Sequence, residues 1–156
     1  MLTLLLLLTC IGAALVGGVF FAFSSFVMKA LGQLPAASGV AAMQRINVVV
    51  LNPWFLGAFM GTALLAAACV VAAVMLRAEP RAPWVLAAGL CYLIGTFGVT
   101  MGFHVPRNQR LAQLDAASPQ AAAYWPDYLR VWTRGNHVRT LAALVAAGCA
   151  LMGQMP

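Results

Sequence analysis

Acidic side chains are almost absent from this chain. Its 156 residues include only three Asp and Glu, and charged residues of both signs make up 8% of the sequence. In a typical soluble domain about a quarter of the residues are charged. The three acids, Glu79, Asp115 and Asp127, lie between long apolar runs and not within them. Ion and proton pumps need carboxylates inside the membrane, so this distribution argues against a pump.

Potential metal ligands are also sparse. The four cysteines lie singly inside apolar runs, which is typical of small apolar residues at helix contacts and not of a disulfide framework or redox centre: Cys10, Cys69, Cys91 and Cys149. The only histidines are His104 and His137. An alternative is that they ligate haem or copper, with Met28 or Met43 as a further copper ligand. No carboxylate or C-x-x-C-H partner accompanies them, so we predict no cofactor and no metal site.

Long apolar runs are what the chain has in abundance, since 63% of its residues are hydrophobic. Runs of about twenty apolar residues predict helices that cross the hydrocarbon core. There are four, at about residues 2–27, 48–76, 84–105 and 136–155. The last is short, and its helix is expected to begin near Pro126. No basic residue precedes Lys29, which argues against a cleaved signal peptide. We expect one all-α domain over residues 1–156, a four-transmembrane-helix bundle.

The net charge of +6 is explained by where the basic residues lie. Most are in the first and third loops: Lys29, Arg45, Arg107, Arg110, Arg130, Arg134 and Arg139. Only Arg77 and Arg81 lie in the second loop. Excess Lys and Arg remain on the cytoplasmic side, which predicts cytoplasmic first and third loops and both termini outside. The charge therefore predicts contact with the lipid bilayer and no nucleic-acid binding.

Capping residues predict short interfacial helices in the cytoplasmic loops. Ser38 is a suitable N-cap for an amphipathic segment before the second apolar run. Pro106 is expected to stop the third span, and Asn108 to cap a short helix after it. Ser118, followed by Pro119, is expected to start another short helix. These helices would cover the cytoplasmic mouth of the bundle.

The most unusual segment is Trp125–Thr140, where aromatic, polar and basic side chains directly precede an apolar run. On a continuous helix, five of them recur at steps of three and four residues, with His137 on their flank. They are Trp125, Tyr128, Trp132, Asn136 and Arg139. A stripe this polar is costly against lipid, so we expect it to face the bundle and to form a functional site.

Two other groups of residues are candidates for the remaining walls of that site. A stripe in the first span predicts either helix packing or a pocket wall: Gly17, Phe21, Ser24 and Met28. Before the second span, Asn47 aligns with Met43 and Val50, and Asn52 precedes Pro53. The two asparagine amides either bond carbonyl groups freed by the proline or point into a cavity.

The roles within Trp125–Thr140 stay open between two interpretations. His137 is either a histidine bonded to a carbonyl at the interface or a catalytic or ligand-binding group. Arg139 either anchors a lipid headgroup or holds an anionic substrate. A non-enzymatic bundle that binds a small molecule or lipid is therefore an alternative to an enzyme, and glycine-rich helix faces allow a homo-oligomer.

Short motifs in a consistent order extend from the first span to the last. They are Gly18–Ser24 with Met28, Met43–Asn47, Asn52 with Pro53, Val105–Asn108 with Leu111, and Trp125, Tyr128 and Trp132 leading into Asn136–Thr140. The chain thereby resembles the anthrone-oxygenase-like family of small four-helix membrane proteins, which implies the bacterial inner membrane. The family usually has asparagine in place of His104 and an aromatic residue in place of Gly135. The first departure adds a titratable group, and the second is expected to enlarge the pocket.

The resemblance implies oxidation of a small flat aromatic, an anthrone, at its central methylene by dioxygen and without a cofactor. The delocalised carbanion of such a ketone is electron-rich enough to reduce dioxygen. The protein would supply a base, oxyanion donors and a dry pocket. We expect His137 as the base and Asn136, Asn108 and Asn47 as amide donors, with Arg139 supporting the negative charge. The expected substrate contacts are Trp132, Tyr128, Ser24, Phe21, Met28, His104 and Asn52.

Overall fold

The computed structural model describes residues 1–155, which form five helices and no strand. The first and fourth contain π-helical turns, labelled η. The helices are α1 (Leu2–Ala22) continuing through η1 (Phe23–Val27) into α2 (Met28–Gly32); α3 (Ala36–Val49); α4 (Pro53–Met75); α5 (Ala82–Leu90) continuing through η2 (Cys91–Gly98) and η3 (Thr100–His104) into α6 (Val105–Ala112); and α7 (Pro119–Met152). The expected all-α architecture is confirmed.

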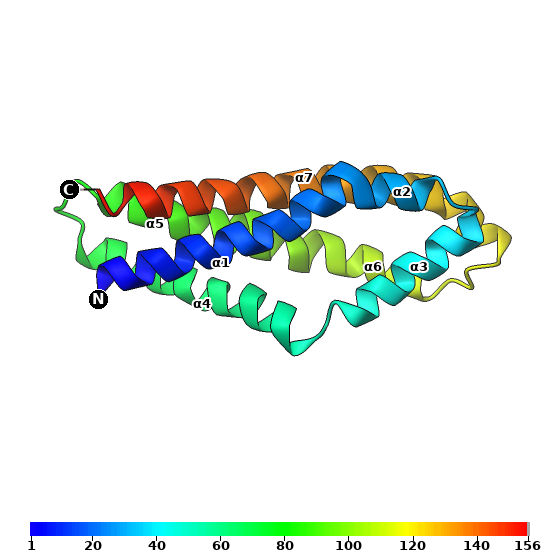
Figure 1. Ribbon diagram of the computed structural model, residues 1–156, viewed down its shortest axis with the longest axis horizontal. Helices are drawn as coiled ribbons and strands as arrows, with labels where there is room; N and C mark the ends of the chain where they lie inside the picture. Colours follow the sequence, from blue (N-terminus) through cyan, green and yellow to red (C-terminus); the bar gives the residue numbers. More distant parts are fainter. Residues whose placement is uncertain (156) are drawn as a thin grey trace.

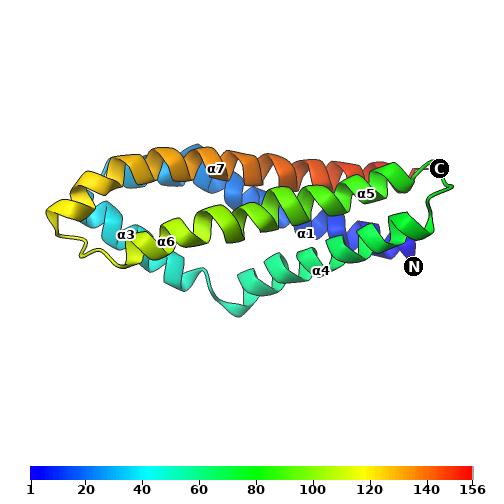
Figure 2. The same ribbon diagram turned by 180° about the vertical axis from the view of Figure 1, so that it is seen from behind.

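Four of these helices run side by side along the long axis of the molecule (Figures 1 and 2). The α1 helix packs on α4 and α7, and α5 packs on the same two helices, so the four form a closed bundle. The shorter α3 lies at the end of the bundle opposite the N- and C-termini (Figure 1). Both ends of the chain thus lie together, and the segments 33–35 and 113–118 lie at the other end.

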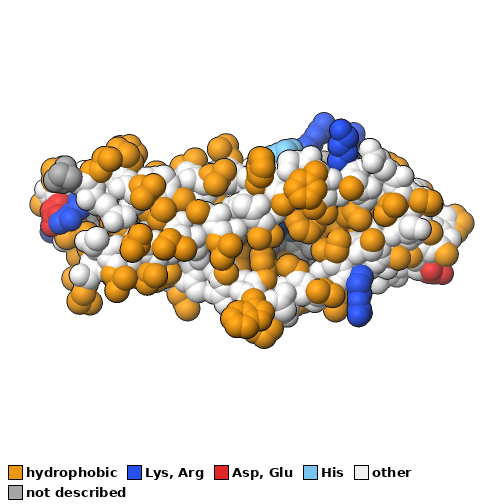
Figure 3. All heavy atoms as spheres, viewed as in Figure 1, with side chains coloured by type: hydrophobic (Ala, Val, Ile, Leu, Met, Phe, Trp, Pro, Cys, Tyr) orange, Lys and Arg blue, Asp and Glu red, His pale blue; other side chains and the backbone are white. Residues whose placement is uncertain are grey.

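Three helices are long and apolar enough to cross a membrane: Leu2–Gly32, Pro53–Met75 and Ala82–Ala112. Large apolar side chains project outward from all of the long helices. Examples are Leu15 (58% exposed), Leu64 (74%), Ile94 (65%) and, on α7, Leu141 (65%). Figure 3 shows such side chains over most of one flank of the bundle. A surface of this kind is suited to hydrocarbon. The fourth crossing and the sidedness stay predictions.

Several helix boundaries differ from those predicted. Pro106 does not stop the third span, because the helix runs on to Ala112 and Asn108 lies inside it. Ser118 does cap a helix, accepting a hydrogen bond from the Ala121 amide at 3.1 Å, but that helix is the long α7. Pro126 is consequently an internal residue and not part of the first turn. Only α3 is a separate short helix, and it begins at Ala36 without a side-chain cap, so Ser38 is not its N-cap.

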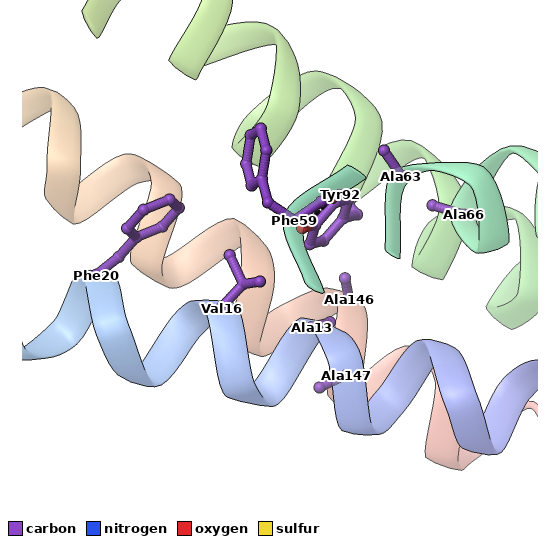
Figure 4. Close-up of a cluster of buried hydrophobic side chains, with 9 residues drawn as sticks. All are labelled: Ala13, Val16, Phe20, Phe59, Ala63, Ala66, Tyr92, Ala146 and Ala147. Carbon is purple, nitrogen blue, oxygen red and sulfur yellow. Dashed lines mark hydrogen bonds between the residues drawn. The ribbon is translucent and has the colours of Figure 1, made fainter. Parts of the chain in front are cut away.

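The core of the half nearer the termini is closely packed. Small residues dominate where α1 meets α7, and Ala13 and Ala146 are fully buried there. Figure 4 shows Phe20 and Val16 of α1 beside Phe59 of α4, Tyr92 of η2 and the alanines of α7. The Tyr92 hydroxyl donates to the Phe59 carbonyl at 3.1 Å. Small side chains allow helix backbones to approach closely, which is how membrane helices associate.

Candidate functional site

A cavity of about 500 Å³ lies between η1, the junction of α3 and α4, η3, α6 and α7. Its volume suits a ligand of several rings, since small-molecule sites are commonly 300–1,000 Å³. Figure 3 shows a hollow in this part of the surface. Most of the wall is apolar, with aromatic side chains from three helices: Phe20, Phe23, Phe55, Phe59 and Trp132. The polar lining residues are Gln44, Asn47, Thr100, His104, Asn108, Gln109 and Arg139.

Arg139 is the only cation in this wall, and only 4% of it is exposed. Its Nη1 donates to Thr100 Oγ1 at 3.2 Å, and its guanidinium lies 4.0 Å from the Phe20 ring centre and 5.0 Å from that of Trp132. Within residues 1–155 the ion pairs join Arg81 to Glu79 and Arg130 to Asp127. No carboxylate therefore balances the charge of Arg139. Burying an unbalanced charge costs several kcal/mol.

Asn136 fixes the orientation of that guanidinium. Its Oδ1 accepts hydrogen bonds from Arg139 Nη2 at 2.6 Å and Nε at 3.2 Å. Its Nδ2 donates to the Phe20 carbonyl and to Ser24 Oγ, both at 2.6 Å. Asn136 thus joins α7 to α1 and leaves its own hydrogen-bonding capacity fully used. It positions Arg139 and does not line the cavity.

Two other side-chain amides, those of Asn108 and Asn47, belong to residues that line the cavity. Asn108 Oδ1 accepts from the Tyr128 hydroxyl at 2.8 Å and from Trp132 Nε1 at 3.0 Å. This pair of bonds fixes which end of the Asn108 amide faces α7, so its Nδ2 remains a free donor. Asn47 Nδ2 is buried and meets no acceptor in hydrogen-bonding geometry, although the Tyr128 hydroxyl lies near it. Buried polar atoms are normally paired, so an unpaired one calls for an explanation, such as a missing partner. Trp125 Nε1 is a second unpaired buried donor, but Trp125 does not line the cavity.

Tyr128 holds the Asn108 amide in place from outside the cavity wall. The side chain is 1% exposed and stacks on Trp125, with ring centres 5.6 Å apart. Burial raises the pKa of the Tyr128 hydroxyl above its ordinary value, because the phenolate would be poorly solvated. The hydroxyl therefore keeps its proton and donates to Asn108. Tyr128 positions a wall residue and is not itself in the wall.

His104 is a wall residue whose two ring nitrogens both face backbone carbonyls. Nε2 lies 3.2 Å from the Trp132 oxygen and Nδ1 lies 3.4 Å from the Val99 oxygen. The ring meets the Trp132 ring edge to face, with centres 5.0 Å apart. His104 therefore joins η3 to α7. Its place in the wall agrees with the expected histidine beside the site, but both ring nitrogens are engaged by backbone carbonyls.

Gly135 does not itself line the cavity. The space beside it is filled by the rings of Phe103 and His104. His104 and Gly135 are thus in contact with each other.

His137 lies outside the cavity wall. The inward stripe on α7 is confirmed, because Trp125, Tyr128, Trp132, Asn136 and Arg139 are all buried. His137 follows the buried Asn136 but lies on the outer face of α7, where Arg134 and Val138 are also exposed. A base at His137 would therefore act away from the cavity. The expected site is corrected at this position.

The residues of the first span that line the cavity also differ from those predicted. Ser24 bonds Asn136, and Met28 is buried against α7 and α3, so both take the packing role and neither lines the cavity. Phe21 is 58% exposed and points outward. The wall is formed by Phe20 and Phe23 instead. A π-helical turn has more residues per turn than an α-helix, so η1 shifts the inward face after Ala22.

The two asparagines before the second span have different roles. Asn52 is an N-cap: its Oδ1 accepts from the amides of Trp54 at 3.1 Å and Phe55 at 3.0 Å. Its Nδ2 donates to the Val49 carbonyl at 3.0 Å, four residues before Pro53, so of the two alternatives Asn52 follows the first and bonds a carbonyl that the proline leaves free. Asn47 lines the cavity with Met43, as the alternative interpretation required.

Several residues of the cavity wall are not among the site residues predicted from the sequence. Phe55 and Phe59 stack across one turn of α4, with ring centres 5.9 Å apart, and their four-residue spacing was the available signal. Gln44 donates to the carbonyls of Leu111 and Leu114, both at 2.8 Å, and so fixes α3 to the end of α6. Thr100 lies in η3, whose π-helical register no simple periodicity predicts.

No metal centre is recognisable in the part of the chain that the structure describes. Residues 1–155 contain no group of three or more His, Cys, Asp or Glu side chains suited to hold an ion. The two histidines do not share a site, since His104 lines the cavity and His137 is exposed. The haem or copper alternative therefore has no preformed ligand pair among these residues.

Comparison with known proteins identifies one family. A family model described as anthrone oxygenase matches residues 53–149, which is more than half of the chain. The matched range contains the Val105–Asn108 and Trp125–Thr140 motifs, and the motifs before Pro53 lie outside it. No curated protein matches the chain, and no solved structure does.

Proposed function

The chain belongs to the anthrone oxygenase family, and we propose that it is a membrane oxygenase whose cavity binds the anion of a flat, electron-rich aromatic ketone. Arg139 is the observation that carries this proposal. A buried cation without a carboxylate faces a cavity with aromatic walls. An anionic ligand would offset the cost of burying that charge. The free amides of Asn47 and Asn108 are donors as well, so the polar groups offered to the ligand suit an oxyanion.

The proposed reaction converts the methylene group of an anthrone to a carbonyl. One anthrone and one dioxygen give one anthraquinone and one water. Both C–H bonds of the methylene break, one oxygen atom becomes the new carbonyl, and the other leaves as water with the two hydrogens. The four electrons lost by carbon are those that reduce dioxygen, so the equation needs no further reductant.

The side chains of the cavity contribute by stabilising charge. An anthrone that has lost one methylene proton to water carries negative charge on its ketone oxygen. Arg139 and the two amides would donate to that oxygen, which lowers the pKa of the methylene and favours the anion. The aromatic rings of Phe20, Phe55 and Trp132 would stack on the substrate and exclude water. The anion then transfers an electron to dioxygen.

The membrane arrangement is part of the same proposal. The fourth crossing would be the predicted span at residues 136–155, since Leu141 and Leu144 of α7 point outward like the exposed side chains of the other helices. Both termini would face outward and segments 33–35 and 113–118 the cytoplasm, as the basic residues favour. The cavity would then lie toward the cytoplasmic end of the bundle.

Turnover of anthrone by the purified protein tests the function. Anthraquinone formation and oxygen uptake are followed in detergent and corrected for spontaneous oxidation. Arg139→Gln is expected to lower kcat/KM by about a hundredfold or more, because it removes the charged donor to the oxyanion. Arg134→Gln is the matched control: it is an exposed arginine on the same helix and should stay within about twofold of wild type.

Two results would overturn the proposal. The first is full turnover by a folded Arg139→Gln protein. The second is a wild-type protein that neither oxidises anthrone nor binds anthracene-2-carboxylate, an unreactive three-ring anion.

A further inference from the structure

Gly135 permits a close contact between α7 and η3. A Cβ built at this position would lie 2.7 Å from Cδ1 of Phe103, closer still to its Cε1, and 3.0 Å from Cε1 of His104. Side-chain carbons do not approach so closely, so any other residue must displace these rings. The same test at Gly148, also on α7, finds nothing within 4 Å. The contact is therefore specific to Gly135 and not a general property of glycines in this helix.

His104 connects this contact to the ligand cavity. One side of its ring faces Gly135, and the residue also lines the cavity. Its Nε2 lies 3.2 Å from the carbonyl oxygen of Trp132, and Trp132 Nε1 donates to Asn108 at 3.0 Å. The missing side chain at position 135 thus determines how far η3 stands from the helix that carries Arg139.

We propose that Gly135 and His104 are positioning residues that set the width of the cavity between η3 and α7, and so determine the ring size of the anionic aromatic that it accepts. This inference rests on the proposed function, because it assumes the same ligand class at the same cavity. It adds a determinant of specificity that lies outside the oxyanion donors.

The direction of the effect follows from what surrounds the two rings. Phe103 is held from outside by Arg107, whose guanidinium lies 3.6 Å from the ring centre and donates to the Phe103 carbonyl at 2.8 Å. His104 has the open cavity beside it. A methyl group at position 135 meets Phe103 most closely and His104 at 3.0 Å, and a displaced His104 ring would move toward the cavity that it lines. A narrower cavity should lower the affinity for a large ligand more than the affinity for a small one.

Binding of three carboxylates of increasing size tests this. Benzoate, 2-naphthoate and anthracene-2-carboxylate are anions at neutral pH and present one, two and three rings. Gly135→Ala should weaken anthracene-2-carboxylate about tenfold relative to wild type, and leave benzoate within about twofold. Gly148→Ala, the matched control on the same helix, should leave the ratio of the two affinities unchanged.

A second pair of variants separates positioning from a loss of stability. His104→Asn shortens the wall residue, so it should raise the three-ring to one-ring affinity ratio at least about threefold. Combined with Gly135→Ala, it should restore much of the three-ring binding that the single variant loses. A purely structural role would lower the melting temperature without changing this ratio. The His104→Asn measurement does not depend on whether Gly135→Ala folds.

The outcomes separate this inference from the proposed function. If the wild-type protein binds these anions but the affinity ratio is the same in Gly135→Ala and His104→Asn, the positioning role is wrong and the anion site stands. If the wild-type protein binds none of the three, both the proposed function and this inference are wrong.

Discussion

The two halves of the bundle bury polar groups in different ways. In the half nearer the termini, the hydroxyls of Thr9, Thr62 and Tyr92 each donate to a backbone carbonyl. In the half with the cavity, Asn47 Nδ2 makes no hydrogen bond and Arg139 has no carboxylate partner. Both halves are polar inside, so polarity alone does not distinguish them. Donors that the protein itself leaves unused mark the half that can bind a ligand.

The largest effect is expected where the cavity half depends on a fully bonded residue. Asn136→Ala removes the acceptor of two Arg139 donors and one of the donors to the Phe20 carbonyl. The free energy of unfolding should fall by roughly 3 kcal/mol, because a buried charged group loses its hydrogen bonds. Anion binding should fall with it. Denaturant unfolding in detergent and titration with anthracene-2-carboxylate measure the two quantities.

Tyr92→Phe is the matched change in the other half. It removes one neutral hydrogen bond to the Phe59 carbonyl, which is worth about 1 kcal/mol. It should leave anion affinity unchanged. An Asn136→Ala protein with wild-type affinity, or a Tyr92→Phe protein that loses binding, would break the distinction between the two halves.

Asn47→Leu separates stability from binding. Asn47 Nδ2 is buried without a partner, so its removal costs no hydrogen bond within the protein. The free energy of unfolding should stay the same or rise by about 1 kcal/mol, because an unsatisfied donor is replaced by an apolar group. Affinity for anthracene-2-carboxylate should fall about tenfold through loss of one donor to the anion.

The opposite pattern would contradict the assignment of Asn47. A variant that is clearly destabilised yet binds normally would mean that Asn47 supports packing. Asn52→Ala provides the comparison, because Asn52 caps α4 and donates nothing to the cavity. It should lose about 1 kcal/mol of stability and keep its affinity.

The sequence was sufficient to predict the bundle and the inward stripe of α7. The length and apolar character of a run are enough to predict a membrane helix, whatever the order of residues within the run. The stripe from Trp125 to Arg139 kept its register because α7 is one uninterrupted α-helix, even through Pro126. Where periodicity is regular and unbroken, residue spacing alone places side chains on a face.

The rest of the site depends on local geometry that spacing does not encode. The π-helical turns of η1 and η3 rotate the helix faces, which brings Phe23 and Thr100 to the cavity. The packing of His104 against Gly135 is a contact between two helices, and a pattern within one helix cannot show it. Asn108 was interpreted as a cap because Pro106 was expected to end the helix before it.

The smallest effect is expected at His137, the other histidine. It shares α7 with Arg139 but lies on the exposed face, beside Arg134. His137→Ala should change the free energy of unfolding by less than about 0.5 kcal/mol and leave anthrone turnover within about twofold of wild type. Steady-state kinetics across pH 5 to 9, compared with wild type, measure this. A loss of turnover as large as that of Arg139→Gln would mean that unused donors do not mark the whole reactive site, and that a proton acceptor on the outer face of α7 contributes to it.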